Sequence, residues 1–347
     1  MIEWIELKYF RNHDHLKLAL NSKTTFLEGS NGSGKTSVLE AIYFSGLLKS
    51  HRTSDDKALI QETKPFARIN LKTSKHLYQT IISPSGKHLK IDGRPILKMS
   101  EYIGGYKVII FSPEDLDIIK GIPGIRRSFL DIEMFQIDDS YGRILNVYKK
   151  VLRQRNALLK RLTLKDDFTF IKILNKRLMS EADKIIAGRR AFIKDLNQAF
   201  IKRFKTFNET DRVMIIYEPN TEINTLESML NERISKDILS KNTNVGPHRD
   251  DFKVLYNGLD AKQYASQGQQ RLITIALKLS VIDLLKEKNQ IVILLDDVMS
   301  ELDEQTVKSL EVLIHSKHQT IITGTKSNYD HIQTINLDDK GEIIDGE

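Results

Sequence analysis

The chain contains no cysteine among its 347 residues, which excludes disulfide bonds and metal sites built on thiolates. No apolar run approaches the roughly 20 residues that a helix needs to span a bilayer. The first residues, MIEWIELKYF, carry acidic side chains early and contain no apolar segment followed by a cleavage site, so we expect no secretory signal. We therefore expect a cytoplasmic protein without a membrane partner.

Positive charge is concentrated in one part of the chain. Hydrophobic residues make up 40% and charged residues 29%, an ordinary balance for a folded protein, and the length predicts roughly two domains. The net charge is +7, but residues 141–207 alone contain 18 Lys or Arg against 5 Asp or Glu, so the rest of the chain is net acidic. Such a segment indicates a polyanionic partner.

The order of the predicted elements indicates an α/β protein. A strand over residues 24–28 is followed by a helix over Ser37–Leu48, and β-like runs broken by glycine and proline predict hairpins between Phe66 and Ile96. The other predicted strands are residues 2–10, Tyr106–Pro113, 250–258, Ile291–Asp297 and Gln319–Thr325.

The middle of the chain has a different pattern. Apolar residues recur at helical spacing over Tyr141–Leu162 and Lys172–Phe207, on either side of the turn TLKDDF. This spacing predicts two antiparallel helices that bury their apolar stripes against each other. We expect an α/β head formed by residues 1–115 and 225–347, interrupted by a mainly helical arm at residues 116–224.

A phosphate-binding loop is predicted near the N-terminus. The segment GSNGSGKT matches the pattern GxxxxGK[ST] between a predicted strand and a predicted helix, the context that confirms such a match. Its glycines let successive N–H groups point at phosphate oxygens, and the helix start adds partial positive charge. Lys35 is expected to reach the β- and γ-phosphates of ATP, and a glycine-rich turn without a ligand is the alternative. The residues expected to bind ATP are Gly29, Ser30, Asn31, Gly32, Ser33, Gly34, Lys35 and Thr36.

The second half of a nucleoside triphosphatase site is predicted much later in the chain. The segment IVILLDD, Ile291–Asp297, predicts a buried strand that ends in two acids. Asp296 and the hydroxyl of Thr36 are expected to hold Mg²⁺, while Asp297, with Lys35, is expected to be catalytic by polarising the attacking water. Alone, such a strand often only meets solvent at its end, but its place after a phosphate-binding loop favours the catalytic interpretation.

A polar loop with the sequence ASQGQ begins an apolar helix at Ser266. Its backbone N–H groups are expected to form another anion site. The loop resembles the signature loop of ABC-type ATPases, in which Ser and Gly contact the γ-phosphate bound by the opposite protomer. This resemblance implies that Ser266, Gly268 and Gln269 bind the ATP of a second molecule, and SELD, Ser300–Asp303, resembles the D-loop of the same class. The alternative is that Ser266 only caps the helix.

A more specific resemblance covers nearly the whole chain. The blocks FRNH, FLEGSNGSGKTSVLEAIY, KSHRT, FSPEDLDIIKGIPGIRRSFLD, VGPHRDDF, SQGQQR and LLDDVMSELD occur in the order of the RecF family of bacterial recombination mediators. The resemblance implies an α/β, ABC/SMC-type P-loop ATPase head of mixed sheets and helices with a helical arm. It also implies an ATP-dependent homodimer that binds duplex DNA and junctions at gaps. Acting with RecO and RecR, it would promote RecA loading in repair, replication restart and the SOS response.

Three departures from the broader ABC pattern predict a slow enzyme. Thr323 or Thr325 stands where a histidine is usual, no glutamine is present near Phe111–Asp115, and Asp297 replaces the commoner glutamate. We therefore expect a weak, DNA-stimulated ATPase that serves as a switch.

Two basic motifs have two interpretations each. His248 and Arg249 of GPHRDD either contact nucleotide or DNA, or form a turn whose acids solvate a strand start. Arg126 and Arg127 either bind phosphate or pair with Asp131. The charges of the arm either contact DNA or solvate its surface, and their imbalance favours DNA contact.

Two other functions fit the same head. An ATPase subunit of a membrane transporter is the main alternative, but the basic arm and the lack of a block for a coupling helix favour DNA repair. The third is a structural or nuclease-associated head of the SMC type. The chain is too short for a long coiled coil, and it lacks an acidic cluster for a nuclease.

Overall fold

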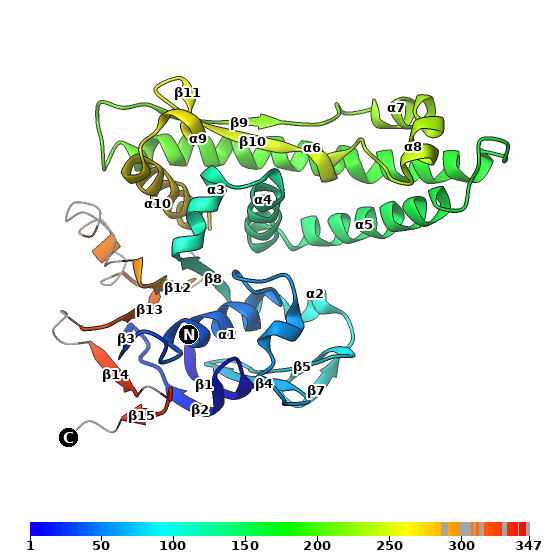
Figure 1. The fold of residues 1–347 in the computed structure, drawn as a ribbon. Coiled ribbons are helices and arrows are strands. Elements are labelled where there is room, and N and C mark those ends of the chain that lie inside the picture. The colour runs from blue at the N-terminus through cyan, green and yellow to red at the C-terminus, as the bar shows by residue number, and fades with distance from the viewer. Residues whose placement is uncertain are drawn as a thin grey trace. The chain divides into compact units, whose positions relative to one another are not determined.

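The computed structural model describes residues 1–285, 291–298, 307, 310–311, 316–327, 332–338 and 340–344. Contacts between residues divide the chain into two compact units, one formed by Met1–Asp115 and Leu285–Glu347 and the other by Leu116–Leu284 (Figure 1). Each unit has its own sheet structure and its own buried core.

The first unit contains a mainly parallel six-stranded sheet in the order β15-β14-β3-β13-β12-β8. Only β15 is antiparallel to its neighbour. All six residues of β12 are buried, as expected for a parallel strand covered on both faces. The strands are β3 (Thr24–Gly29), β8 (Lys107–Phe111), β12 (Ile291–Asp296), β13 (Gln319–Gly324), β14 (Gln333–Leu337) and β15 (Ile343–Ile344).

An antiparallel six-stranded sheet in the order β2-β1-β4-β5-β6-β7 completes this unit. The predicted hairpins are confirmed in β4 to β7, and helix α1 (Lys35–Leu47) contacts strands of both sheets. All residues of α1 except Thr36 are buried, so this helix is a core element whose first turn carries the phosphate-binding motif. The strands and short helices are β1 (Ile2–Phe10), β2 (His13–Ala19), η1 (Asp56–Leu59), β4 (Ala67–Thr73), β5 (Leu77–Ser83), β6 (Gly86–Ile91), β7 (Arg94–Ile96) and α2 (Met99–Tyr102).

The second unit is built around the two long helices that the apolar spacing predicts. Helices α5 (Asp139–Leu159) and α6 (Thr169–Phe204) lie side by side, and α6 also contacts β9 (Val213–Glu218) and α10 (Gln267–Leu284) (Figure 1). The sheet of this unit is antiparallel, in the order β11-β10-β9. Its other elements are η2 (Pro113–Leu116, which begins in the first unit), α3 (Asp117–Lys120), α4 (Pro123–Ile137), α7 (Leu226–Glu232), α8 (Ile234–Ser240), η3 (Pro247–Arg249), β10 (Asp251–Tyr256), β11 (Leu259–Asp260) and α9 (Ala261–Tyr264).

The second unit extends further along the chain than we expected. We expected the head to resume at residue 225, but residues 225–284 belong to the compact unit of the long helices. Strand β10 pairs with β9 over its whole length, and the guanidinium of Arg203 on α6 forms an ion pair with Asp283 on α10. The signature-like loop before α10 therefore belongs to the second unit, while the phosphate-binding loop belongs to the first.

Candidate nucleotide site

The phosphate-binding motif forms the turn between β3 and α1. Strand β3 ends at Gly29, and α1 begins at Lys35 after Gly32 and Gly34, whose φ angles are 93° and 90°. Other residues rarely adopt this left-handed backbone. A Cβ atom on Gly34 would lie 2.5 Å from Nε2 of His13, so the close approach of the β1–β2 turn also requires glycine here.

The ammonium group of Lys35 lies on this turn. It donates to the carbonyl oxygens of Gly29 and Ser30, each at 2.7 Å. Burial lowers the pKa of Lys35, while the charges of Asp297 and Asp296 raise it. The lysine charge is therefore held at the start of α1, where an anionic ligand is most strongly attracted.

Asp296 is the acceptor of two hydroxyl groups. Oγ1 of Thr36 and Oγ1 of Thr323 both donate to Oδ1 of Asp296, each at 2.9 Å. Strand β13 places Thr323 directly between Asp296 on β12 and Leu27 on β3. Burial raises the pKa of Asp296, and the two hydrogen bonds lower it.

These oxygens suit Mg²⁺ better than they suit a transition metal. Mg²⁺ is commonly held by one or two carboxylates together with the phosphates of a nucleotide. Thr36 and Asp296 supply one hydroxyl and one carboxylate in direct contact. Across the described residues no group of three histidine, aspartate or glutamate side chains could hold an ion by itself. The pair therefore fits a metal that arrives with its nucleotide.

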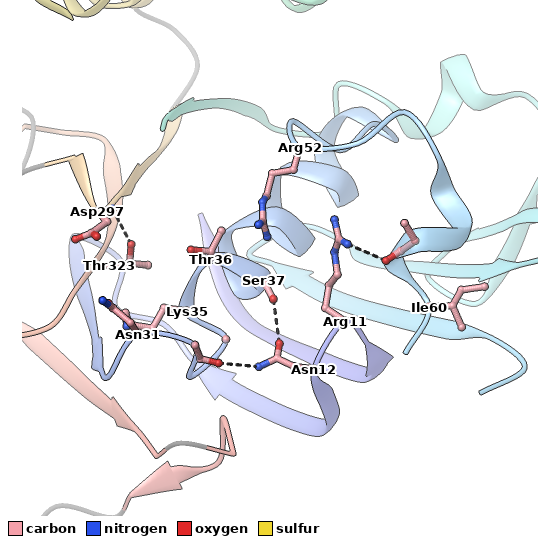
Figure 2. Close-up of a pocket in the computed structure, with 13 residues that line it drawn as sticks. Arg11, Asn12, Asn31, Lys35, Thr36, Ser37, Arg52, Ile60, Asp297 and Thr323 are labelled. Carbon is pink, nitrogen blue, oxygen red and sulfur yellow. Dashed lines mark hydrogen bonds between the residues drawn. The ribbon is translucent and has the colours of Figure 1, made fainter. Parts of the chain in front are cut away.

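Asp297 turns out of the strand that carries Asp296. Its φ angle is 51°, a left-handed conformation that costs a non-glycine residue of the order of 1 kcal/mol and is often found at functional sites. The hydroxyl oxygen of Thr323 accepts its backbone N–H at 3.0 Å (Figure 2). Of the two threonines considered for the position of the usual histidine, Thr323 lines the same cavity as Lys35 and Asp297, while Thr325 lines a different cavity.

A cavity of about 570 Å³ runs from the phosphate-binding loop to the β1–β2 turn. Figure 2 shows Lys35, Thr36 and Asp297 on one side and Arg11 and Arg52 on the other. Both ends belong to the first unit, so a single compact unit supplies the whole cavity. Its lining residues are Arg11, Asn12, Asn31, Gly32, Gly34, Lys35, Thr36, Ser37, Arg52, Ala58, Ile60, Asp297 and Thr323.

The β1–β2 turn forms a part of the cavity that no sequence motif predicted. Asn12 donates to the carbonyl of Gly32 at 3.4 Å and accepts from the hydroxyl of Ser37 at 3.0 Å, so it joins the loop to α1. Arg11 forms a bidentate ion pair with the buried Glu40 of α1, through two hydrogen bonds to its carboxylate. The block FRNH contains Arg11 and Asn12, but nothing in its composition indicates that this strand turn meets the loop.

An acid occupies the segment in which we found no glutamine. Glu114 pairs with Arg52 of the cavity at 3.7 Å. Its charge also acts on Asp296, where it favours the protonated form and so contributes to the raised pKa. The carboxylate of Glu114 therefore acts electrostatically on the end of the cavity near Asp296.

The signature-like loop caps helix α10 with a reciprocal pair of hydrogen bonds. The Ser266 hydroxyl accepts the N–H of Gln269 at 3.3 Å, and Oε1 of Gln269 accepts the N–H of Ser266 at 2.7 Å, which is a capping box. The side chain of Gln269 is used for this cap, whereas Ser266 and Gly268 are exposed. Ser300–Asp303, the D-loop-like segment, lies outside the described residues.

The GPHRDD motif stabilises the second unit from inside. Asp250 is fully buried and accepts from Nη1 of Arg189 at 2.8 Å and from the phenol of Tyr217. His248 lies between the hydroxyl of Tyr148, at 2.6 Å, and the carbonyl of Thr243, at 3.0 Å. The structural interpretation of His248 is thereby favoured, while Arg249 is exposed.

Of the two interpretations of Arg126 and Arg127, the pairing with Asp131 is wrong. Arg126 forms two hydrogen bonds to Asp251, at 2.6 and 2.8 Å, and Arg127 donates to a backbone carbonyl. Asp131 instead pairs with Arg189 and Lys149. These partners are far apart in the chain, so spacing alone could not identify them.

Most basic side chains of α5 and α6 are exposed. Arg155 and Arg189 are exceptions, with exposed fractions of 0% and 2%. The basic surface of the two helices consists of Arg143, Lys149, Lys150, Arg153, Lys172, Lys176, Arg177, Lys184, Arg190, Lys194 and Lys202. None of the helices in the described ranges combines the length and apolar character needed to cross a membrane.

Known proteins resemble this chain along almost its full length. The family model of the RecF/RecN/SMC N-terminal domain matches residues 1–335. The DNA replication and repair protein RecF of Acholeplasma laidlawii is 42% identical over 334 residues, which cover 96% of this chain and 95% of that protein. RecF of Lactobacillus johnsonii is 39% identical over 340 residues, with 92% and 91% covered.

Solved structures give the same result for the fold. The recombination mediator protein RecF with ATP, from the RecFOR pathway, has a TM-score of 0.89 at 31% identity and covers 99% of this chain and 98% of its own. The Smc head domain of Pyrococcus furiosus has a TM-score of 0.55 at 17% identity and covers 99% and 95%, which supports the fold alone.

Proposed function

The chain belongs to the RecF family, and from that premise we propose that it is an ATP-dependent DNA-binding protein of recombinational repair. The observation that carries the proposal is the 2.9 Å hydrogen bond between Thr36, next to the phosphate-binding lysine, and Asp296 at the end of β12. It joins the two halves of an ATP and Mg²⁺ site that are 260 residues apart in the sequence. The solved relative with ATP supports the choice of nucleotide.

The residues of the cavity divide the chemistry among them. The backbone N–H groups of Ser30–Gly34 and the ammonium of Lys35 bind phosphate oxygens. Thr36 and Asp296 hold Mg²⁺, which supplies positive charge where negative charge develops during phosphoryl transfer. Asp297 is turned into the cavity, where its carboxylate orients and polarises a water molecule.

Hydrolysis is proposed to be slow, so that ATP acts as a switch. Thr323 stands where ABC-type ATPases usually have a histidine, and its hydroxyl is engaged with Asp296 and the backbone of Asp297. A threonine hydroxyl bonded in this way orients its neighbours, but unlike a histidine it does not titrate near neutral pH. The enzyme is accordingly a weak, DNA-stimulated ATPase whose bound state matters more than its turnover.

The signature-like loop is proposed to contact the ATP of a second copy of the chain. Ser266 and the Gly268 N–H lie at the exposed start of α10, where a helix offers unbonded amides to an anion. Two copies arranged head to tail would each complete the other's site. Gln269 contributes by holding this loop, because its side chain is already bonded to the backbone of Ser266.

Duplex DNA and junctions at gaps are the proposed ligands of the arm. Exposed cations of α5 and α6 contact phosphates without reading base sequence. RecO and RecR are the proposed partners, and promotion of RecA loading, replication restart and SOS induction are the proposed outcomes in the cytoplasm. The match over residues 1–335 favours this function over a transporter ATPase subunit.

Analytical ultracentrifugation with and without ATP tests the proposal. The wild-type chain should be monomeric without nucleotide, dimeric with Mg·ATP, and retained on gapped duplex DNA when dimeric. Lys35→Ala removes the charge that binds the phosphates, so it should stay monomeric, while Lys90→Ala, at an exposed position on β6, should behave as wild type. A wild-type chain that neither dimerises nor binds DNA more tightly with ATP contradicts the proposal.

A further inference from the structure

The loop before α10 is held by a chain of three hydrogen bonds that ends on a carboxylate. The N–H of Ser266 donates to Oε1 of Gln269 at 2.7 Å. Nε2 of Gln269 donates to the hydroxyl oxygen of Tyr256 at 3.0 Å. The hydroxyl of Tyr256 in turn donates to Oδ2 of Asp211. All four residues belong to the second unit.

The direction of this chain fixes the orientation of Gln269. Each group donates toward Asp211 and accepts from the side of Ser266. If the amide of Gln269 were reversed, its NH₂ group would face the N–H of Ser266, and two donors would meet. Hydrogen bonds that are aligned in one direction polarise one another. The negative charge of Asp211 therefore strengthens all three hydrogen bonds.

Asp211 is itself firmly held. Its carboxylate accepts from Asn257 at 2.9 Å and from Asn208 at 2.6 Å. The hydrogen bonds from Tyr256 and Asn257 lower the pKa of Asp211, so the carboxylate stays charged at neutral pH. The ring of Tyr256 also packs edge-on against Phe204, the last residue of α6.

Three elements therefore meet at the signature-like loop. Tyr256 is the last residue of β10, Asp211 belongs to the turn after α6, and Gln269 lies in the first turn of α10. These contacts fix the helix start that carries Ser266 and Gly268. The first N–H groups of a helix have no acceptor within it, so they remain able to bind an anion.

We infer that Tyr256 and Asp211 are positioning residues, which hold Gln269 and thereby keep the loop of Ser266 and Gly268 shaped for the γ-phosphate of a partner's ATP. The inference rests on the proposed function, since it requires an ATP-driven dimer. A loop that is already ordered loses less conformational entropy when it binds. Breaking the chain of hydrogen bonds should therefore weaken dimerisation while leaving the phosphate-binding loop of the first unit unchanged.

The test compares two substitutions that each remove one phenolic hydroxyl from the same unit. Tyr256→Phe breaks the chain of hydrogen bonds but keeps the aromatic ring beside Phe204. Tyr148→Phe is the matched control, because that hydroxyl bonds His248 and takes no part in the chain. The measurements are the dimer dissociation constant with a slowly hydrolysed ATP analogue, the affinity of the monomer for ATP, and the melting temperature.

Tyr256→Phe removes the hydrogen bonds of the hydroxyl to both Gln269 and Asp211, so it should weaken dimerisation about three- to tenfold, with unchanged ATP affinity. Tyr148→Phe should dimerise as wild type. Asp211→Asn should also raise the dimer dissociation constant. The double variant should raise it by less than the product of the two single effects, because both substitutions break the same chain of hydrogen bonds.

The outcomes separate the inference from the proposed function. A wild-type chain that stays monomeric with ATP overturns the proposed function and the inference with it. If the wild type dimerises and Tyr256→Phe dimerises equally well, only the inference is overturned. The same holds if Tyr148→Phe weakens the dimer as much as Tyr256→Phe does, since the effect would then be general to the unit.

Discussion

Thr323 donates a hydrogen bond from its hydroxyl to Oδ1 of Asp296, over 2.9 Å between the neighbouring strands β13 and β12. The same hydroxyl oxygen accepts the backbone N–H of Asp297 at 3.0 Å. One buried side chain thus fixes both the acid expected to hold Mg²⁺ and the acid expected to orient water. The geometry of hydrolysis should therefore depend on Thr323 although it carries no charge.

Replacing Thr323 by valine should slow hydrolysis without abolishing ATP binding. Valine has nearly the same shape but leaves the N–H of Asp297 without its acceptor, which should also destabilise the fold by about 1–3 kcal/mol. Single-turnover hydrolysis and urea unfolding measure the two effects. Thr325→Val is the control, because Thr325 does not line the nucleotide cavity. Equal turnover in both variants would show that Thr323 is not needed for the geometry of the site.

Asp297→Asn should separate hydrolysis from Mg·ATP binding. Asparagine keeps the size of the side chain but removes the carboxylate that polarises water, so turnover should fall by a factor of about 10² or more. Asp296 should still hold Mg²⁺, and the ATP-bound dimer should live longer on DNA. Phosphate release and dimer lifetime measure these effects. Unchanged turnover would place the catalytic carboxylate elsewhere.

Stability should fall as the pH decreases from neutral, because His248 is buried in its neutral form. Burial and the nearby Arg249 and Arg127 lower the pKa of His248 to about 4, from an ordinary value of 6.5. The unfolded chain therefore binds a proton that the folded chain does not. Full stability is expected above pH 6.5, with a loss of up to about 3 kcal/mol between pH 6.5 and 4 and no further loss from this group below that.

The contribution of His248 can be isolated with a matched pair of variants. His248→Gln can still bond Tyr148 and Thr243 but cannot titrate, so its stability should depend less on pH in this window. His88→Gln, at an exposed position on β6, should keep the wild-type dependence. Urea unfolding at several pH values makes the comparison. Parallel curves for all three proteins would contradict the assignment to His248.

Neutralising exposed cations of the arm should weaken DNA binding in a salt-dependent way. Lys150, Arg153, Lys176 and Arg177 are exposed on α5 and α6, whereas Arg189 is buried against two acids and Arg190 pairs with Glu222. The first four should be changed to glutamine. Each lost phosphate contact should reduce the slope of log K against log salt by about 0.9 on duplex DNA.

A duplex titration at several salt concentrations, with and without ATP, provides this slope. ATP should strengthen binding, because two heads would bring two basic surfaces onto one duplex. ATP affinity should be unchanged in the variant and serves as the control for correct folding. A slope and affinity equal to those of the wild type would show that these charges only solvate the helices.

The site was predictable where its chemistry is local. The glycine-rich turn before α1, the two acids at the end of β12 and the capping serine of α10 are each specified by a few consecutive residues, and each lies where the pattern placed it. The two long helices were predictable for a similar reason, since apolar spacing marks the buried face of each.

Contacts between distant segments were not predictable. The sequence offers several acids as possible partners of Arg126. Only the folded structure identifies Asp251 as its partner, whereas Asp131 pairs with Arg189. Strand β9 was not predicted, because its partner β10 follows only after two further helices. The pairing of β9 with β10 places residues beyond 225 in the second unit, which ends at Leu284. The role of Gln269 likewise depends on Tyr256, which nothing in the loop itself identifies.

Mixing two inactive variants tests the central claim most directly. Lys35→Ala should lose ATP binding but keep its loop at Ser266, and Ser266→Arg should bind ATP but obstruct the γ-phosphate of its partner. Neither should dimerise alone in sedimentation with ATP. An equal mixture should dimerise, more weakly than the wild type, because one of its two ATP sites joins an intact phosphate-binding loop to an intact signature-like loop. A mixture that stays monomeric where the wild type dimerises, or Ser266→Arg that dimerises alone, would contradict the account.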